Sequence, residues 1–175
     1  MPSRKPDLAR KGGGCRYSSI AASAALSNST TETTLDSKAL QADELSAGDV
    51  IEFYAQGIAT ATNSTDTLQV KVKFGTTVIA QTAAVDVADN DVWVIQGFMT
   101  VRTDGASGTF VSAAFVQLGV EATATARMDI VASTAIDTTA ALTFAVTGTW
   151  SVASASNSCR NDQFYFHVLR PYAFD

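Results

Sequence analysis

A two-residue alternation of apolar and polar side chains runs through the middle of this chain and constrains its fold more than any other feature. The alternation is cleanest in residues 68–74, where Leu68, Val70, Val72 and Phe74 are separated by Gln69, Lys71 and Lys73. Successive side chains of a β-strand point to opposite faces, so this pattern predicts a strand with one buried and one exposed face. Gly75-Thr76 then predicts a tight turn into a hairpin partner at residues 77–82.

Similar patterns predict strands along most of the chain. The other predicted strands cover residues 50–57, 92–102, 110–118, 128–133, 142–150 and 163–169. Both faces of the strand at 163–169 are apolar or aromatic, which predicts that it is central or covered by a partner. Gly97 shares a face with Trp93 and Ile95, which indicates a bulge or a close approach of another backbone. Residues 27–34 are predicted to add an edge strand, and residues 40–45 a single helical turn.

The predicted elements amount to about eight or nine strands with no long helix in a chain of 175 residues. This pattern favours an all-β protein in which two antiparallel sheets pack into a β-sandwich of the jelly-roll type. An immunoglobulin-like sandwich is the alternative, but the chain lacks the Cys–Trp–Cys spacing of that fold. We expect a basic N-terminal arm and lead-in at residues 1–27 and one sandwich domain at residues 28–175.

The surface of this domain is expected to carry few charges. Charged residues make up 17% of the chain, against about 25% in a typical soluble protein. A lone monomer usually relies on surface charge for solubility, so a surface rich in Thr, Ser and Ala favours one that is covered by neighbours. A hydroxyl-rich β surface without any partner is the other interpretation.

The charge is distributed unevenly between the two ends of the chain. The first 16 residues carry a net charge of +4, because five basic residues stand against Asp7; since the whole chain carries −5, the remainder carries −9. Gly12 to Gly14 and two prolines oppose helix formation there, which predicts a flexible basic arm on an acidic body. Extended, such an arm reaches roughly 50 Å. Its basic residues are Arg4, Lys5, Arg10, Lys11 and Arg16.

Neither a secretion signal nor a membrane span is expected. The stretch that follows the basic start is too polar for the core of a signal peptide, and no apolar run reaches the roughly 18 residues of a membrane helix. We therefore expect a soluble protein made inside a cell. Cys15 and Cys159 lie far apart in the sequence, which favours two free thiols over a disulfide or a metal site.

Residues suited to catalysis are few. His167 is the only histidine. A Cys159/His167 nucleophile pair is conceivable, but no residue pattern predicts a group that would orient the imidazole. A Ser-His-Asp site would need the same histidine, and there is no G-x-S-x-G elbow. Glu52 has no evident partner for a pair of glycosidase carboxylates. We predict no enzyme activity and no catalytic residue.

Binding sites for metals, cofactors and nucleic acids are equally weakly indicated. Asp86, Asp89 and Asp91 could surround a calcium ion, but their spacing matches no calcium loop and is typical of a solvated turn. Gly12 to Gly14 lack the strand and the Gly-Lys-Ser/Thr sequence of a phosphate loop. The basic arm could touch nucleic acid, yet no second basic patch or recognition module accompanies it. We expect no cofactor, no metal, no specific nucleic acid and no membrane partner.

Four short stretches resemble a β-sandwich common among virion proteins of tailed bacteriophages. They are Thr31-Glu32-Thr33-Thr34-Leu35, the run from Gly48-Asp49-Val50-Ile51 to Gly57, the run from Leu68-Gln69-Val70 to Gly75, and the run from Trp93-Val94-Ile95 to Arg102. The resemblance covers about residues 31–118 and implies a jelly roll. Members of this group decorate capsids as cement proteins or form the knobs of fibres and spikes, usually as trimers. The resemblance implies no catalytic residues.

The leading hypothesis is therefore a capsid decoration protein that binds the outer head surface of a virion after synthesis in the host cytoplasm. The basic arm would lie along the acidic surface of the major capsid protein or another virion protein. Thr-rich sheet faces, or Tyr165 and His167, would meet sister subunits of a homotrimer. A receptor- or glycan-binding knob of a tail fibre is the alternative, which predicts exposed aromatic residues near loops such as 103–108. A small hydrolase that uses His167 is the third.

Overall fold

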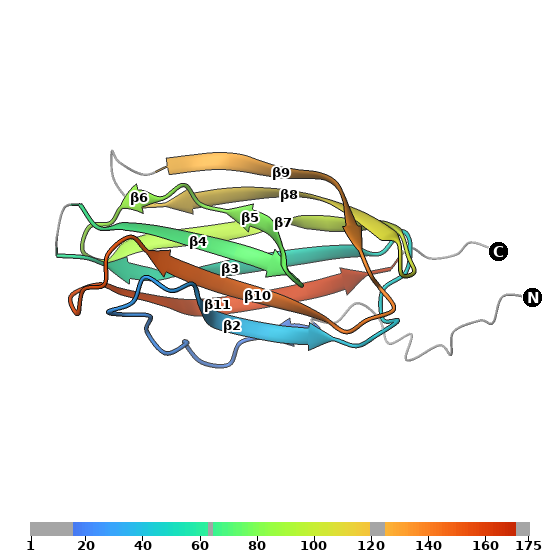
Figure 1. The fold of residues 1–175 in the computed structure, drawn as a ribbon, viewed down its shortest axis with the longest axis horizontal. Helices are drawn as coiled ribbons and strands as arrows, with labels where there is room; N and C mark the ends of the chain where they lie inside the picture. Colours follow the sequence, from blue (N-terminus) through green and yellow to red (C-terminus); the bar gives the residue numbers. More distant parts are fainter. Residues whose placement is uncertain (1–15, 63–64, 120–124, 171–175) are drawn as a thin grey trace, which may run out of the picture.

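The computed structural model describes residues 16–62, 65–119 and 125–170, and the regular structure in these ranges is entirely β-strand (Figure 1). The strands are β1 (Tyr17–Ser18), β2 (Thr33–Leu40), β3 (Val50–Thr60), β4 (Thr67–Phe74), β5 (Thr77–Gln81), β6 (Val85–Asp86), β7 (Asp91–Thr103), β8 (Gly108–Leu118), β9 (Thr125–Ile136), β10 (Leu142–Trp150) and β11 (Ser158–Leu169). Each strand predicted from residue 50 onward has a counterpart among them.

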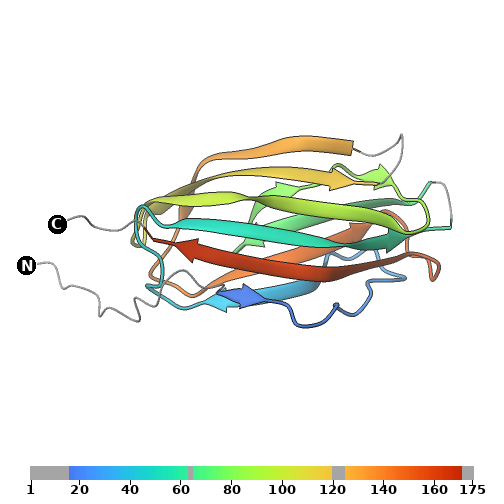
Figure 2. The same ribbon diagram turned by 180° about the vertical axis from the view of Figure 1, so that it is seen from behind.

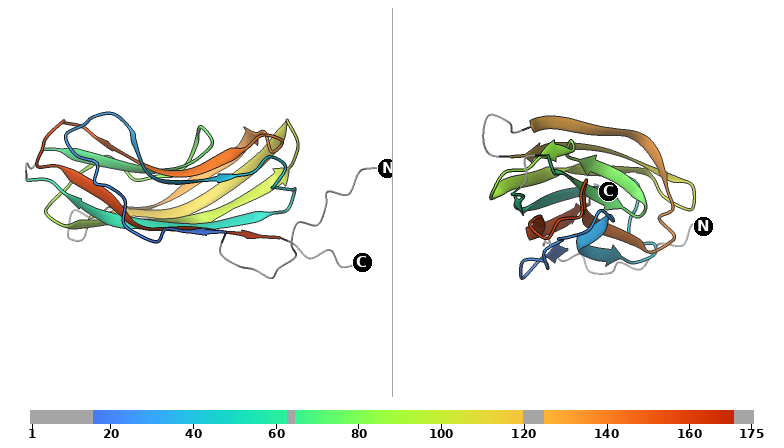
Figure 3. Two further views of the ribbon diagram at one scale, coloured as in Figure 1. Left: turned by 90° about the horizontal axis from the view of Figure 1, so that it is seen from below. Right: turned by 60° about the vertical axis from the view of Figure 1, so that its left-hand side comes forward.

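The strands form two antiparallel sheets that pack face to face. The six-stranded sheet has the order β1-β11-β3-β7-β8-β9, as Figure 2 shows from its outer side. The five-stranded sheet has the order β2-β10-β4-β5, with β6 paired to β4, and lies in front in Figure 1. Figure 3 shows the two curved layers from the side. The predicted all-β antiparallel sandwich is confirmed.

The strand pairs are nested in the sequence. β1 pairs with β11, β2 with β10, β3 with β7 and β4 with β5, so the chain resembles one long folded hairpin whose tip is the β4–β5 turn. The additional pairs β3–β11 and β4–β10 close this hairpin into two sheets. β8 and β9 are added between β7 and β10 and extend only the six-stranded sheet.

The β4–β5 hairpin forms as the sequence predicted. Phe74 lies opposite Thr77, and the turn between them is Gly75-Thr76. Gly75 adopts a φ of +60°, which glycine tolerates without steric cost. Burial alternates along β4 as the apolar pattern requires, with Leu68 to Phe74 buried at every second position.

Gly97 marks a close approach and not a bulge. The register of β7 is regular through this position, with Phe53 on one side and Ala114 on the other. A Cβ atom on Gly97 would lie 2.4 Å from the carbonyl oxygen of Ala113 and 2.7 Å from the Cα of Ala114. The absence of a side chain therefore lets β8 lie against β7 at this point.

Aromatic rings fill the centre of the sandwich. The ring of Phe144 on β10 lies 5.5 Å from Phe53, 5.3 Å from Phe74 and 5.1 Å from Phe166, between ring centroids. These rings come from both sheets and are almost fully buried. The apolar faces predicted from the alternation thus meet in one core, and this core holds the two sheets together.

Two predictions in the N-terminal third are wrong. The edge strand lies at Thr33–Leu40 and not at 27–34, because Asn28 adopts a φ of 50° and the Ser29 hydroxyl accepts a hydrogen bond from the Thr31 N–H. Hydroxyl-rich sequence suits such a turn as well as it suits a strand. No helical turn follows Leu40, because the chain reverses at Asp43 with a φ of 59°.

Residues 16–26 lie along the edge of β11. The main-chain N–H groups of Ser19 and Ser23 donate to the carbonyls of Phe164 and Asn161, at 2.7 and 2.8 Å. The hydroxyls of the same two serines accept hydrogen bonds from the N–H groups of those residues. This part of the expected lead-in therefore covers a sheet edge. The rest of the arm, including Arg4, Lys5, Arg10 and Lys11, lies outside the described residues.

Candidate interaction surface

The outer side of the six-stranded sheet carries two neighbouring rows of side chains, which we call the outer face. Strand register places the members of each row directly opposite one another on β11, β3, β7, β8 and β9. One row is His167, Glu52, Phe98, Ala113 and Ile130, and the other is Tyr165, Tyr54, Gln96, Phe115 and Met128.

Large apolar side chains of the outer face are exposed on β7 and β9. Ile130 is 73% exposed, Met128 63% and Phe98 54%. Among the described residues, Phe98 is the one phenylalanine or tryptophan whose side chain is exposed. Large exposed apolar side chains gathered on one face are typical of interaction sites.

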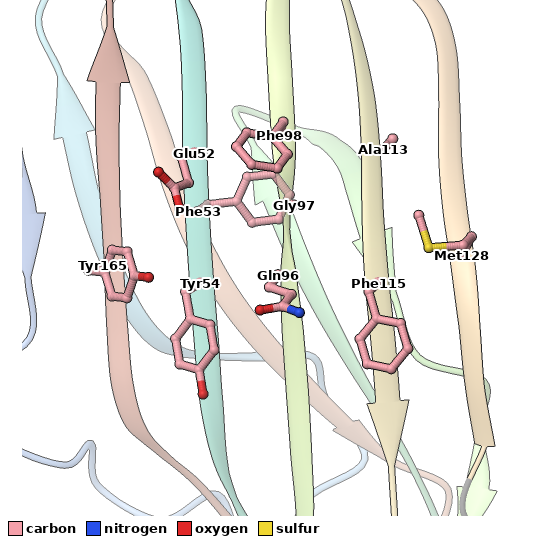
Figure 4. Close-up of a pocket in the computed structure, with 10 residues that line it drawn as sticks. All are labelled: Glu52, Phe53, Tyr54, Gln96, Gly97, Phe98, Ala113, Phe115, Met128 and Tyr165. Carbon is pink, nitrogen blue, oxygen red and sulfur yellow. The ribbon is translucent and has the colours of Figure 1, made fainter.

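A hollow of about 330 Å³ lies in the middle of this face, and Figure 4 shows the residues that line it. Gly97 and Ala113 line it together with larger residues, and these two contribute little or no side chain. Phe98, Phe115 and Met128 also line it, and their side chains surround the hollow in Figure 4. The hollow is therefore mainly apolar on the side of β7, β8 and β9.

Aromatic and polar groups occupy the other half of the outer face. The rings of Tyr54 and Tyr165 stack with centroids 5.4 Å apart and planes at 18°. His167 meets Tyr165 edge to face at 5.5 Å. The structure thus brings together Tyr165 and His167, the two residues predicted to meet sister subunits, on an accessible surface. Glu52 lies opposite His167 on the neighbouring strand.

The outer side of the five-stranded sheet has a different character. The carboxylate of Glu32, in the segment before β2, binds the ammonium groups of Lys71 and Lys73, both at 2.9 Å. The hydroxyl of Thr147 donates to the same carboxylate at 3.1 Å. These lysine hydrogen bonds lower the pKa of Glu32 to about 2. The charges of Glu32, Lys71 and Lys73 on this side of the sandwich are therefore paired with one another.

The predicted arm residue Arg16 is engaged with the body. Its guanidinium contacts the carboxylate of Glu44, and its main-chain N–H donates to the carbonyl of Phe166 at 3.0 Å. Beside it, Tyr17 donates a hydrogen bond to Asp36 at 2.7 Å. Burial and this bond raise the pKa of Tyr17 to about 12. Arg16 and Tyr17 therefore anchor the start of the described chain to the domain.

The Cys159/His167 pair is not assembled. Cys159 is fully buried on the inner face of β11, whereas His167 lies on the outer face. The strand shifts register between Asn161 and Gln163 without bringing the two residues closer. Burial raises the pKa of the Cys159 thiol to about 12, so this cysteine is a core residue.

The three aspartates considered for calcium have other surroundings. The carboxylate of Asp91 accepts a hydrogen bond from the N–H of Ala88 at 2.8 Å and so closes the turn before β7. Asp86 belongs to β6. Within residues 16–62, 65–119 and 125–170, no three His, Cys, Asp or Glu side chains gather as metal ligands. The same ranges contain no helix long and apolar enough to cross a membrane.

Sequence reasoning missed the apolar half of the outer face. It identified the buried residues of the strand at 92–102 but gave no role to Phe98, which has the opposite parity. This parity could have identified Phe98 as an exposed residue, because a phenylalanine between Gln96 and Thr100 on a polar face is unusual. No local signal showed that Phe98 would lie in one row with Ile130, with Ala113 between them. Comparison of the chain with protein-family models, curated proteins and solved structures finds no match.

Proposed function

We propose that this protein is a structural component of a tailed-bacteriophage virion, a capsid decoration protein that acts through protein contacts and has no catalytic role. The outer face is the observation that carries this proposal. It presents Phe98, Met128 and Ile130 to solvent on a rigid sheet, and a surface of that kind suits a lasting protein interface. Stabilisation of a capsid requires such contacts, repeated over many copies.

The nested strand pairs support a jelly-roll assignment within the sandwich. A jelly roll consists of eight strands in two sheets, and virion proteins frequently use it. The strands β1, β11, β3 and β7 would form one four-stranded sheet of the roll, and β2, β10, β4 and β5 the other. In this assignment β8 and β9 are additions that widen the sheet bearing the outer face.

The proposed partners are the major capsid protein, or another virion protein, and further copies of this chain in a homotrimer. The basic arm supplies attachment, because its net charge of +4 complements an acidic capsid surface. The virion is the proposed location, after synthesis in the host cytoplasm. Arg16 lies at the base of the arm, where its contact with Glu44 ties it to the domain.

Attachment to capsids tests this proposal. The full-length protein should co-sediment with capsids of the parent phage, and a variant with Arg4, Lys5, Arg10 and Lys11 all replaced by Gln should bind more weakly. Raising the salt concentration should weaken the wild type and affect the variant less, because the lost contacts are electrostatic. The variant Arg102→Gln removes an exposed cation of the body and should bind as the wild type does. Failure of the wild type to bind any capsid would contradict the proposal.

A receptor- or glycan-binding knob is the second candidate. The stacked pair Tyr54–Tyr165 lies beside Glu52 and Gln96, and rings next to hydrogen-bonding groups suit the flat face of a sugar. This function predicted exposed aromatic residues near loop 103–108. The exposed aromatic side chain of Phe98 lies instead within β7. Binding of the purified protein to host cells that Tyr54→Ala abolishes would favour this function over decoration.

A further inference from the structure

We infer that the outer face is covered by the same face of another copy of this chain. This inference rests on the proposed function but replaces its homotrimer by a two-fold pair, because a contact between identical faces joins two copies around a two-fold axis. It places the contact around Phe98, Ala113 and Ile130, on the β7–β8–β9 half of the sheet. Tyr165 and His167 then lie toward the side of the contact and not at its centre.

The size of the surface fits a stable contact between two proteins. The contact is centred on β7, β8 and β9 and extends over the whole outer side of the sheet around the two rows. Five strands at about 4.8 Å spacing, each about ten residues long at about 3.3 Å per residue, offer a surface there on the order of 800 Å². A standard specific interface buries about 800 Å² on each partner. Small ligands occupy enclosed pockets that surround most of their surface, whereas the hollow on this face is partly open to solvent.

The distribution of charged side chains favours the outer face of a second copy as the partner surface. Residues 17–175 carry a net charge of −9, so two copies repel each other through most of their surfaces. In the two rows of the outer face, Glu52 and His167 are the only residues with acidic or basic side chains apart from the tyrosine hydroxyls. Among the described surfaces, the opposite sheet offers the Lys71, Lys73 and Glu32 network instead. Burying that network would cost desolvation, and the two rows of the outer face, which hold only Glu52 and His167 as acidic and basic groups, avoid most of this cost.

The relief of the face is self-complementary. Ile130 projects from β9, and Ala113 lies directly opposite it on β8, where it helps to line the hollow. Each copy thus presents a large apolar projection next to a depression with small side chains. Packing of one copy's projection into the other copy's hollow brings close-packed apolar contacts, which interfaces require at their centre.

The native mass of full-length variants tests this inference. We expect the wild type to have the mass of a dimer by light scattering, and both Phe98→Glu and Met128→Glu to reduce the mass to that of the single 18.3 kDa chain; a trimeric wild type would contradict the two-fold contact. The matched control is Thr143→Glu, which places the same charge on an exposed position of β10 in the other sheet, and its mass should equal that of the wild type. Far-UV circular dichroism verifies that each variant retains its β structure.

A second readout locates the contact directly. In a Cys15→Ser background, Ala113→Cys supplies one accessible thiol, since Cys159 is fully buried. Maleimide should label this thiol slowly in the oligomer and rapidly once Phe98→Glu is added. Rapid labelling in an intact oligomer would overturn the inference while leaving self-assembly in place. A monomeric wild type that still binds capsids would overturn it too, and the proposed virion function would stand.

Discussion

The carboxylate of Asp129 on β9 accepts a hydrogen bond from the main-chain N–H of Gln81 on β5, with the two atoms 2.8 Å apart. Arg127 donates to the carbonyl oxygen of the same Gln81 at 2.9 Å. Two side chains thus take the place of a neighbouring strand and join the edges of the two sheets. The residues beside them, Met128 and Ile130, belong to the outer face, so this link positions the proposed contact.

Removing the Asp129 carboxylate should loosen this side of the sandwich. Asp129→Ala leaves the Gln81 N–H without its charged acceptor, and we expect the free energy of unfolding to fall by about 1–2 kcal/mol. Ser133→Ala, at an exposed position of the same strand, should change it little. Urea denaturation of the monomeric Phe98→Glu background measures both without a contribution from assembly. Equal stability of the two variants would show that the link is not stabilising.

The Glu32 network should make stability depend on acid pH. Its hydrogen bonds with Lys73 and Lys71 hold the pKa of Glu32 at about 2, below the ordinary value of 4.5. Its contribution is therefore complete above pH 4.5 and is lost as the pH falls toward 2. Because the carboxylate is 31% exposed, we expect Glu32→Gln to cost only about 1 kcal/mol at pH 7.

The pH profile of the difference tests this explanation. Chemical denaturation of the wild type and Glu32→Gln at pH 7, 4.5, 3 and 2 should show a gap that closes as the pH falls. Asp86→Asn, at an exposed position, is the control and should show no comparable gap at pH 7. A gap that persists unchanged at pH 2 would mean that packing and not charge explains the effect of Glu32→Gln.

Two strand glycines should respond differently to the same substitution. Gly97→Ala places a Cβ 2.4 Å from the carbonyl oxygen of Ala113, and main chain on β8 cannot move aside easily. Gly148→Ala places one 3.1 Å from Leu26 Cδ2, the end of a rotatable side chain. We expect the first to cost more than about 2 kcal/mol and the second less than about 1 kcal/mol. Thermal unfolding compares them, and equal melting temperatures would contradict the close approach of β7 and β8.

Cys159 should be unreactive in the native protein. Burial raises its pKa to about 12, and thiol reagents attack the thiolate. In the Cys15→Ser background, a colorimetric disulfide reagent at pH 8 should detect no thiol until denaturant is added, after which one thiol should react. A thiol that titrates rapidly without denaturant would show that the inner face of β11 opens in solution.

Strand positions and buried faces could be predicted from the sequence because both depend on local patterns. The alternation from Leu68 to Phe74 required one buried face and one exposed face wherever the strand was placed, and Gly75 allowed the turn that follows. The N-terminal third could not be predicted, because it lacks such a local pattern. Residues 27–34 lack apolar alternation, so their turns depend on hydrogen bonds that hydroxyl-rich sequence permits but does not require.

By itself the sequence determined that this chain forms a sandwich of sheets with a basic segment preceding it. Only the tertiary structure decided that Phe98, Ala113 and Ile130 lie in one row, although they are separated by more than ten residues each. Rows across a sheet arise from register, which main-chain hydrogen bonds between distant segments set once the apolar faces have met in the core. Local alternation specifies which side of a strand is exposed, but the neighbours on that side depend on the order of the strands.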